Sequence, residues 1–385
     1  MYLWLACLAL GAGQTDWQKH EAVHLKHIHQ VTRDFVRAGE GYFSPDGKKV
    51  IFQAEEKDTG NPFYQIFVMD LATGKYRRVS PGIGRTTCSY FRPDGNRIIF
   101  ASSHRDPDAR KHQAEEYRRR EADRRAHKQR HYQWDFDPYL AIYEANPDGT
   151  GLKPLTHVKS YNAEGSYSAD GKHIVFCSDR DGSLELYVMD ADGKHVRQLT
   201  HAPHCYNGGP FFSPDAKRVI FRSDRKKKDM LQLYVINADG TGERALTDNV
   251  GVNWGPYWYK DGKHIVYAAA DHSNPSVRPN YDLWWMDIDE RARPVSHGNG
   301  QPATVAKAVL AALSGAPASI LYPLCAALAA TERPRLPRPV RITFNPHADV
   351  LPVFSPDGKK IMWTSNRTED GSAQLFIADF VRPKD

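Results

Sequence analysis

Amide and carboxylate side chains recur six and four residues before the first residue of a repeated turn. Their oxygen atoms can bind cations or accept hydrogen bonds from polar ligands. Side chains two residues apart in a strand point to the same face, so we expect both sets to line one opening. The sequence leaves open the alternative that the Asn side chains only shape local turns. The predicted polar ligand site consists of Glu40, Asn162, Glu164, Asn207, Asn253 and Asp349.

Three other patterns resemble catalytic or metal-binding motifs but stand in the wrong context. His20–His24 matches the HExxH pattern of zinc enzymes, yet no glutamate in a metalloprotease-like context follows it. Ser166 lies within a predicted strand rather than on the strand-to-helix elbow of hydrolases. The histidine of His201–Cys205 shares its repeat position with His157 and His297, which indicates loop structure. We therefore predict no catalytic residue, no metal site and no cofactor.

A turn-forming sequence close to Ser-Pro-Asp-Gly recurs six times and identifies the elements that position these residues. Its residue types match the preferences of a type I turn read in order. An aromatic residue that closes an apolar triplet follows six residues after each Asp, which is typical of a strand buried on both faces. The turns are Ser44–Gly47, Arg92–Gly95, Ser168–Gly171, Ser213–Ala216, Tyr259–Gly262 and Ser355–Gly358.

Each repeat contains enough chain for four antiparallel strands, and six such units predict an all-β, six-bladed β-propeller over residues 27–380. The last repeat lacks an outer strand at the C-terminal end. His29–Thr32 stands at the spacing from Ser44 that the outer strands of other repeats keep from the following turn. We therefore expect this N-terminal strand to complete the last blade and close the ring.

A Ser-Asp/Asn-Arg sequence follows the apolar triplet in three repeats. Because the motif occupies one blade position, we interpret it as loop architecture rather than as a catalytic set. The three copies are Ser178–Arg180, Ser223–Arg225 and Ser365–Arg367.

The repeats resemble the WD40-like units of TolB-type propellers, in the turn, the apolar triplet and the Tyr-Val-Met-Asp strand end seen at Tyr187–Asp190. The resemblance covers about residues 27–296 and 339–380. It implies an exported, periplasmic bacterial protein that works through protein contacts. TolB carries an α/β domain before its propeller, whereas we expect a stand-alone propeller here. The hydrolase domain that follows the propeller in dipeptidyl-peptidase relatives is not expected either.

Residues 103–132 form a basic insertion in blade 2, for which the sequence predicts a charged helix. Residues 105–130 hold ten Lys and Arg against six Asp and Glu. One alternative is a helix that is stabilised by ion pairs within itself and packs against the propeller. The other is an arm that docks an acidic partner or an anionic membrane surface. The interspersed acidic residues argue against nucleic acid. The candidate docking residues are Arg118, Arg119, Arg120, Arg124 and Arg125.

Residues 297–339 form a second insertion, between blades 5 and 6, with eleven Ala, six Pro and no charge from Ala308 to Ala330. Pro317 and Pro323 argue against one membrane span. The open alternatives are a helical hairpin, an interfacial segment or a frame error in the sequence. Both Pro294–Ser296 and Arg341–Thr343 are candidates for the outer strand of blade 5.

The composition fits a folded chain with a modest net charge of +6 and five scattered cysteines. Residues 1–13 are apolar and predict a secretion signal, and hence a periplasmic or secreted protein. We expect a monomeric, non-catalytic module that binds a protein or another ligand at the cell envelope. The alternative is a metal-dependent sugar-acid lyase or glycosidase at the propeller mouth, which would need clustered His, Gln and Arg there.

Overall fold

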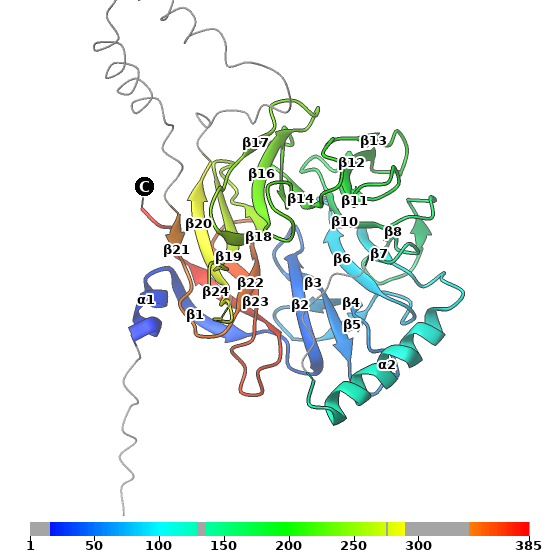
Figure 1. Ribbon diagram of the computed structural model, residues 1–385, viewed down its shortest axis with the longest axis horizontal. Helices are drawn as coiled ribbons and strands as arrows, with labels where there is room; N and C mark the ends of the chain where they lie inside the picture. The colour runs from blue at the N-terminus through cyan, green and yellow to red at the C-terminus, as the bar shows by residue number, and fades with distance from the viewer. Residues whose placement is uncertain (1–15, 129–135, 275, 289–338, 385) are drawn as a thin grey trace, which may run out of the picture.

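The computed structural model describes residues 16–128, 136–274, 276–288 and 339–384 (Figure 1). Within them, six four-stranded antiparallel sheets follow one another along the chain. In each of the first five sheets the chain runs from the inner strand to the outer strand, and the sixth takes its outer strand from the N-terminal end. The predicted all-β, six-bladed propeller is confirmed.

The strands of the six blades have the following bounds. Blade 1 contains β2 (Phe35–Phe43), β3 (Lys49–Glu56), β4 (Gln65–Asp70) and β5 (Tyr76–Arg78). Blade 2 contains β6 (Thr86–Phe91), β7 (Ile98–Ser102), β8 (Ala141–Ala145) and β9 (Lys153–Pro154). Blade 3 contains β10 (Asn162–Tyr167), β11 (His173–Ser178), β12 (Glu185–Asp190) and β13 (Arg197–Gln198). Blade 4 contains β14 (Asn207–Phe212), β15 (Arg218–Ser223), β16 (Gln232–Asn237) and β17 (Arg244–Ala245). Blade 5 contains β18 (Gly251–Trp258), β19 (His264–Asp271), β20 (Asp282–Asp287) and β21 (Val340–Arg341). Blade 6 contains β22 (Asp349–Phe354), β23 (Lys360–Ser365), β24 (Gln374–Phe380) and β1 (Leu25–Gln30).

All six predicted turns form between the first two strands of their blades. In each turn the N–H of the fourth residue donates to the carbonyl of the first at 2.8–3.0 Å. The fourth residue has a φ between +58° and +72°, which explains why five of the six are Gly. The Ser of the first turn also donates to the Asp, from Ser44 to Asp46 at 2.5 Å.

The apolar triplets form the second strand of each blade and bury both of its faces. Phe52 in β3 and Phe100 in β7 are fully buried and share one hydrophobic cluster with Met362 of blade 6. The cluster therefore joins blades 6, 1 and 2, across the point where the ring closes. Burial of such side chains stabilises the fold by roughly 1.5–3 kcal/mol each.

Strand β1 closes the ring by pairing with β24, which confirms the predicted closure. Leu25 lies opposite Phe380 and Gln30 lies opposite Phe376. The buried Thr32 extends this connection, because its hydroxyl donates to Gln374 at 2.8 Å. The strand begins four residues before the predicted segment, and β24 gains a partner on its free edge.

Helix α1 (Asp16–His24) contains the HExxH pattern and anchors the chain to the ring. The buried Glu21 accepts hydrogen bonds from the backbone N–H of Phe344 at 2.9 Å and from Arg367 at 3.1 Å. His20 packs on the ring of Phe344, and His24 contacts the carbonyl of Val381. Each residue of the pattern therefore has a separate structural contact.

Helix α2 (Ala109–Arg125) follows β7, so the predicted helix in the blade 2 insertion is confirmed. The helix packs on the neighbouring blade 1, beside β4 and β5 (Figure 1). Arg120 makes this contact by donating to Glu55 of β3 at 2.7 Å and to the carbonyl of Pro62 at 2.8 Å. Glu116, which is 9% exposed, holds Arg120 from the helix side at 2.8 Å.

Two predicted segments lie outside the described residues. These are residues 1–13, the expected signal, and residues 297–338 of the Ala-rich insertion. Pro294–Ser296, one candidate for the outer strand of blade 5, also lies outside them. The other candidate region supplies β21, in which Val340 pairs with Trp285 and Arg341 with Trp284.

Candidate functional site

A β-bulge interrupts the inner strand of every blade at the same repeat position. The pairing of β2 with β3 shows it, because two residues between Gly39 and Tyr42 stand opposite one residue of β3. The first bulged residue has a φ between +49° and +60° in all six blades. These six residues, which all lie at the centre of the ring, are Glu40, Cys88, Glu164, Gly209, Gly255 and Leu351.

An aromatic cluster fills the centre beside the bulges. Its members stand two residues after a bulged residue, in blades 1, 2, 4 and 5. The ring centroids of Tyr42 and Tyr90 are 5.1 Å apart, and those of Phe211 and Tyr257 are also 5.1 Å apart. The hydroxyls of Tyr90 and Tyr257 lie 3.1 Å from each other. The side chains at this level therefore meet across the centre of the ring.

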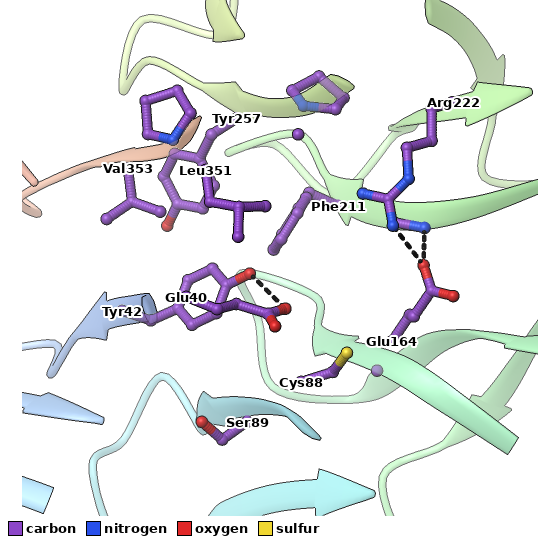
Figure 2. Close-up of a pocket in the computed structure, with 15 residues that line it drawn as sticks. Glu40, Tyr42, Cys88, Ser89, Glu164, Phe211, Arg222, Tyr257, Leu351 and Val353 are labelled. Atoms are coloured by element: carbon purple, nitrogen blue, oxygen red, sulfur yellow. Dashed lines mark hydrogen bonds and ion pairs between the residues drawn. The ribbon is translucent and has the colours of Figure 1, made fainter. Parts of the chain in front are cut away.

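A small chamber remains between the bulged residues and the aromatic cluster (Figure 2). Its free volume of about 20 Å³ is room for about one water molecule. Its charged side chains come from blades 1, 3 and 4, as Glu40, Glu164 and Arg222. The chamber is therefore polar, but it is too small for a sugar or a peptide.

Glu164 and Arg222 form a buried ion pair in this chamber. The Nη2 atom of Arg222 lies 3.0 Å from Oε2 of Glu164, and both side chains are less than 10% exposed. Glu164 also accepts hydrogen bonds from the Tyr161 and Tyr206 hydroxyls, at 2.8 and 2.7 Å, and from the Gly209 N–H at 2.6 Å. The charge on Glu164 is thus fully compensated by protein groups.

Glu40 is the carboxyl group of the chamber that lacks a direct ion-pair partner among the described residues. The Tyr42 hydroxyl donates to it at 3.3 Å (Figure 2). Burial raises the pKa of Glu40 to about 7, because removal from water disfavours the carboxylate more than nearby Arg222 favours it. The negative charge on Glu164 raises this pKa further. Glu40 and Glu164 share the chamber without pairing, as expected for residues of blades 1 and 3.

The other four predicted ligand residues do not line the chamber. The bulge changes the side-chain alternation, so residues two positions apart do not share a face, and the expectation of a common face was wrong. Asn162 and Asp349 accept hydrogen bonds from Arg180 and Arg367 at 2.8 Å. These arginines belong to the Ser-Asp/Asn-Arg sequences, which supports the interpretation of that motif as loop architecture. The four residues, all at most 1% exposed, are Asn162, Asn207, Asn253 and Asp349.

The comparisons with known proteins place this geometry among propellers. No protein-family model matches the chain. The Tol-Pal system protein TolB from Anaeromyxobacter dehalogenans is 40% identical over 111 residues, which cover 29% of this chain and 25% of that protein. The chain is a TolB-like six-bladed propeller. Dipeptidyl-peptidase 5 from Porphyromonas gingivalis is 29% identical over 259 residues, which cover 63% of this chain and 36% of that protein.

Solved structures resemble the TolB-like propeller over most of its length. TolB from Acinetobacter baumannii superposes with a TM-score of 0.50 at 17% identity, covering 90% of this chain and 65% of that one. An oligogalacturonate lyase in complex with manganese superposes with a TM-score of 0.51 at 14% identity, covering 92% and 93%. At this identity the likeness shows the fold alone. The curated relatives named above are matched over only 25% and 36% of their own lengths.

Arg222 is the site residue that the sequence analysis missed, although a signal for it exists. It directly follows the apolar triplet of β15, in a strand buried on both faces. A charged residue inside such a strand requires a buried partner, which marks Arg222 as unusual. The equivalent residues of the other blades of the TolB-like propeller are uncharged and comprise Gln53, Ala101, Cys177, Ala268 and Thr364.

The five predicted docking arginines of α2 divide into two groups. Arg120 faces blade 1, and Arg119 is paired with the buried Glu116. Arg118, Arg124 and Arg125 are exposed. Arg118 and Arg125 lie on the side of the helix away from blade 1, and Arg124 follows Arg120 by four residues near the C-terminal end. Arg125 forms an ion pair with Glu121, another exposed side chain. The outward group presents positive charge without contributing to helix packing.

The described parts of the TolB-like propeller contain neither a metal-binding cluster nor a membrane-spanning helix. Within the described ranges, no three His, Cys, Asp or Glu side chains come together as they would around a metal ion. Neither helix that the structure describes has the length and apolar content needed to cross a bilayer.

Proposed function

We propose that this TolB-like propeller is a non-catalytic protein-binding module of the bacterial cell envelope. The observation that supports this most strongly is the filled centre of the ring. The aromatic cluster and the Glu164–Arg222 pair leave free volume for about one water molecule, where propeller enzymes would need a substrate cavity. This geometry supports recognition on the outer surface of the ring.

The outer face of α2 is the proposed binding surface, and its partner is an acidic protein segment. Arg118 and Arg124 are exposed, and neither forms an ion pair with another described residue. Arg120 fixes the helix on blade 1, so the outward side chains project from an anchored helix rather than from a loose arm. A fixed positive surface favours fast association with an acidic partner.

The envelope location and the monomeric state belong to the same proposal. The relative from Anaeromyxobacter dehalogenans is named as a component of a Tol-Pal system. A periplasmic or secreted location follows if this chain shares that setting and if residues 1–13 act as a secretion signal. A membrane surface rich in anionic lipid is the other target that the α2 arginines would attract.

A metal-dependent lyase is the rival function, because an oligogalacturonate lyase in complex with manganese shares the fold. The inner positions of this ring do not fit a metal. Glu164 is already occupied by Arg222 and three other donors, and the positive charge of Arg222 opposes a cation beside Glu40. We expect no cleavage of oligogalacturonate by the purified protein with Mn²⁺, and a steady release of unsaturated product would replace the proposal with the lyase function.

Capture from the native envelope fraction tests the binding role. The immobilised protein is compared with a variant that carries Arg118→Gln, Arg124→Gln and Arg125→Gln, and captured proteins are quantified by mass spectrometry. We expect the triple variant to capture at least fivefold less of the parent's specific partners. The captured amount should also fall as salt is raised, because surface charges are screened over about 8 Å at physiological ionic strength. The control carries Lys172→Gln, Lys217→Gln and Lys263→Gln, which remove the same number of exposed charges from turns of blades 3, 4 and 5, away from α2, and should retain most capture. Equal capture by parent and triple variant would contradict the proposal.

A further inference from the structure

A second pocket lies on the rim of blade 4, away from the central chamber. Two loops form it, one between β13 and β14 and the other between β15 and β16. Its volume is about 470 Å³, far larger than that of the central chamber. The basic residues that line the pocket are consecutive in the second loop and comprise Arg225, Lys226, Lys227 and Lys228.

The Tyr234 hydroxyl is the group in this pocket that points to a ligand. Tyr234 is fully buried, and its hydroxyl has no hydrogen-bond partner in the structure. A buried hydroxyl without a partner is unfavourable, so such groups are rare unless something completes them. Burial raises the pKa of Tyr234 to about 12, which keeps the hydroxyl protonated and able to donate.

Blade 3 shows what completes the equivalent tyrosine. Tyr187 occupies in β12 the place that Tyr234 occupies in β16, and its hydroxyl donates to the Asp181 carboxylate at 2.5 Å. Asp181 follows the Ser-Asp-Arg sequence of blade 3 directly. In blade 4 the residue that follows this sequence is Lys226. The acceptor carboxylate is therefore replaced by a cation, and the hydroxyl is left unpaired.

The charges around the pocket favour an anion at the position that the Asp181 carboxylate occupies in blade 3. Lys226 is paired with Asp248 at 2.6 Å, and Arg225 is held by Glu243 and Asn207. Asp224, the acidic residue of the lining, already accepts a hydrogen bond from the Tyr206 N–H at 2.7 Å.

Lys227 and Lys228 are exposed, and neither forms an ion pair with another described residue. These two lysines are thus available to bind an anion, beside a buried Tyr234 hydroxyl that lacks an acceptor among the described residues.

We infer that this pocket binds a carboxylate group, which accepts the Tyr234 hydroxyl proton and lies between the Lys227 and Lys228 ammonium groups. The carboxylate takes the role that Asp181 plays in blade 3. It comes either from a small organic acid or from an Asp or Glu side chain of a peptide. The site is independent of the proposed docking role of α2, because α2 packs on blade 1 and the pocket lies on blade 4.

Calorimetric titration at low salt tests this site with two probes, succinate and a tetra-aspartate peptide blocked at both ends. We expect the parent to bind at least one of them. Binding of succinate alone would identify small organic acids, and tighter binding of the peptide would identify acidic protein segments. Absence of binding by both probes would overturn the inference.

Four variants separate a built site from general attraction to lysines. Lys227→Gln with Lys228→Gln should weaken binding at least tenfold, and Lys226→Asp should abolish it, because an Asp there supplies the acceptor that Tyr187 has in blade 3. Tyr234→Phe should weaken binding about threefold while the melting temperature stays equal or rises, since the unpaired hydroxyl is gone. Lys217→Gln, which removes an exposed charge at the opposite end of β15, is the control and should bind as the parent does. Unchanged binding by Tyr234→Phe would overturn the inference.

Discussion

Arg222 of blade 4 donates a hydrogen bond to Glu164 of blade 3 across the inner edge of the ring, with 3.0 Å between Nη2 and Oε2. The two side chains are 8% and 2% exposed, so the pair is almost completely removed from water. The same glutamate oxygen accepts from Tyr206, whose hydroxyl also accepts from Arg222 at 2.8 Å. This network joins two neighbouring blades at the inner edge of the ring.

Loss of one partner of this pair should destabilise the fold strongly. Glu164→Gln leaves the Arg222 charge buried without compensation, and we expect a loss of about 3 kcal/mol in the free energy of unfolding, measured with urea. Glu164→Gln combined with Arg222→Met should recover much of that loss, because no buried charge remains. Glu121→Gln, which breaks the exposed pair with Arg125, is the matched control and should cost less than about 1 kcal/mol. Equal losses of stability in Glu164→Gln and Glu121→Gln would show that water reaches the Glu164–Arg222 pair.

Glu40 should make the stability of the protein depend on pH between about 4.5 and 7. The folded-state pKa of about 7 lies above the ordinary value of 4.5, so the folded protein holds the proton more tightly than the unfolded chain. This contribution is fully present below pH 4.5 and is lost as the pH rises through 7. Glu40→Gln stays neutral, so its free energy of unfolding should gain on the order of 3 kcal/mol relative to the parent from pH 4.5 to pH 8. Parallel unfolding curves at both values check this, and a constant difference would contradict the raised pKa.

Closure by β1 should be essential for cooperative folding. Deletion of residues 17–32 removes the outer strand of blade 6 and the Glu21 anchor, which exposes the edge of β24. We expect aggregation or loss of a single melting transition. Thr32→Val is the milder control, because it removes only the two hydrogen bonds of the Thr32 hydroxyl, one donated to Gln374 and one accepted from the Leu375 N–H, and should cost about 1–3 kcal/mol. A deletion variant that melts like the parent would show that the ring closes without β1.

Gly209→Ala should lower the free energy of unfolding for two separable reasons. Gly209 has a φ of +58°, and a Cβ atom there would contact the Arg222 guanidinium. Gly371 has a φ of +71° with no atom near its added Cβ, so Gly371→Ala measures the backbone cost alone, about 1–2 kcal/mol. We expect Gly209→Ala to cost at least 1 kcal/mol more in chemical denaturation. Equal costs would mean that Arg222 moves aside freely.

The fold could be predicted from the sequence because each blade repeats the same local signals. The turn, the apolar triplet and the position of His29–Thr32 all depend on short-range chemistry, and six copies reinforce one another. The ligand site could not be predicted in the same way. A regular alternation of side chains would place Asn162 and Glu164 on one face. The bulge that begins at Glu164 instead turns Glu164 into the chamber, and Asn162 stays buried against Arg180. Contacts between blades, such as that of Arg120 with Glu55, depend on packing that no local pattern encodes.

Partner capture by two variants, measured side by side, tests most directly whether recognition occurs on the outer surface rather than in the central chamber. The first carries Arg118→Gln, Arg124→Gln and Arg125→Gln on α2, and the second carries Glu40→Gln in the chamber. Near neutral pH, Glu40→Gln should melt at or above the parent temperature and the α2 variant only slightly below it, so capture can be compared between folded proteins. We predict that the α2 variant captures at least fivefold less partner than the parent, whereas Glu40→Gln captures as much as the parent. Loss of capture by Glu40→Gln with full capture by the α2 variant would contradict this account.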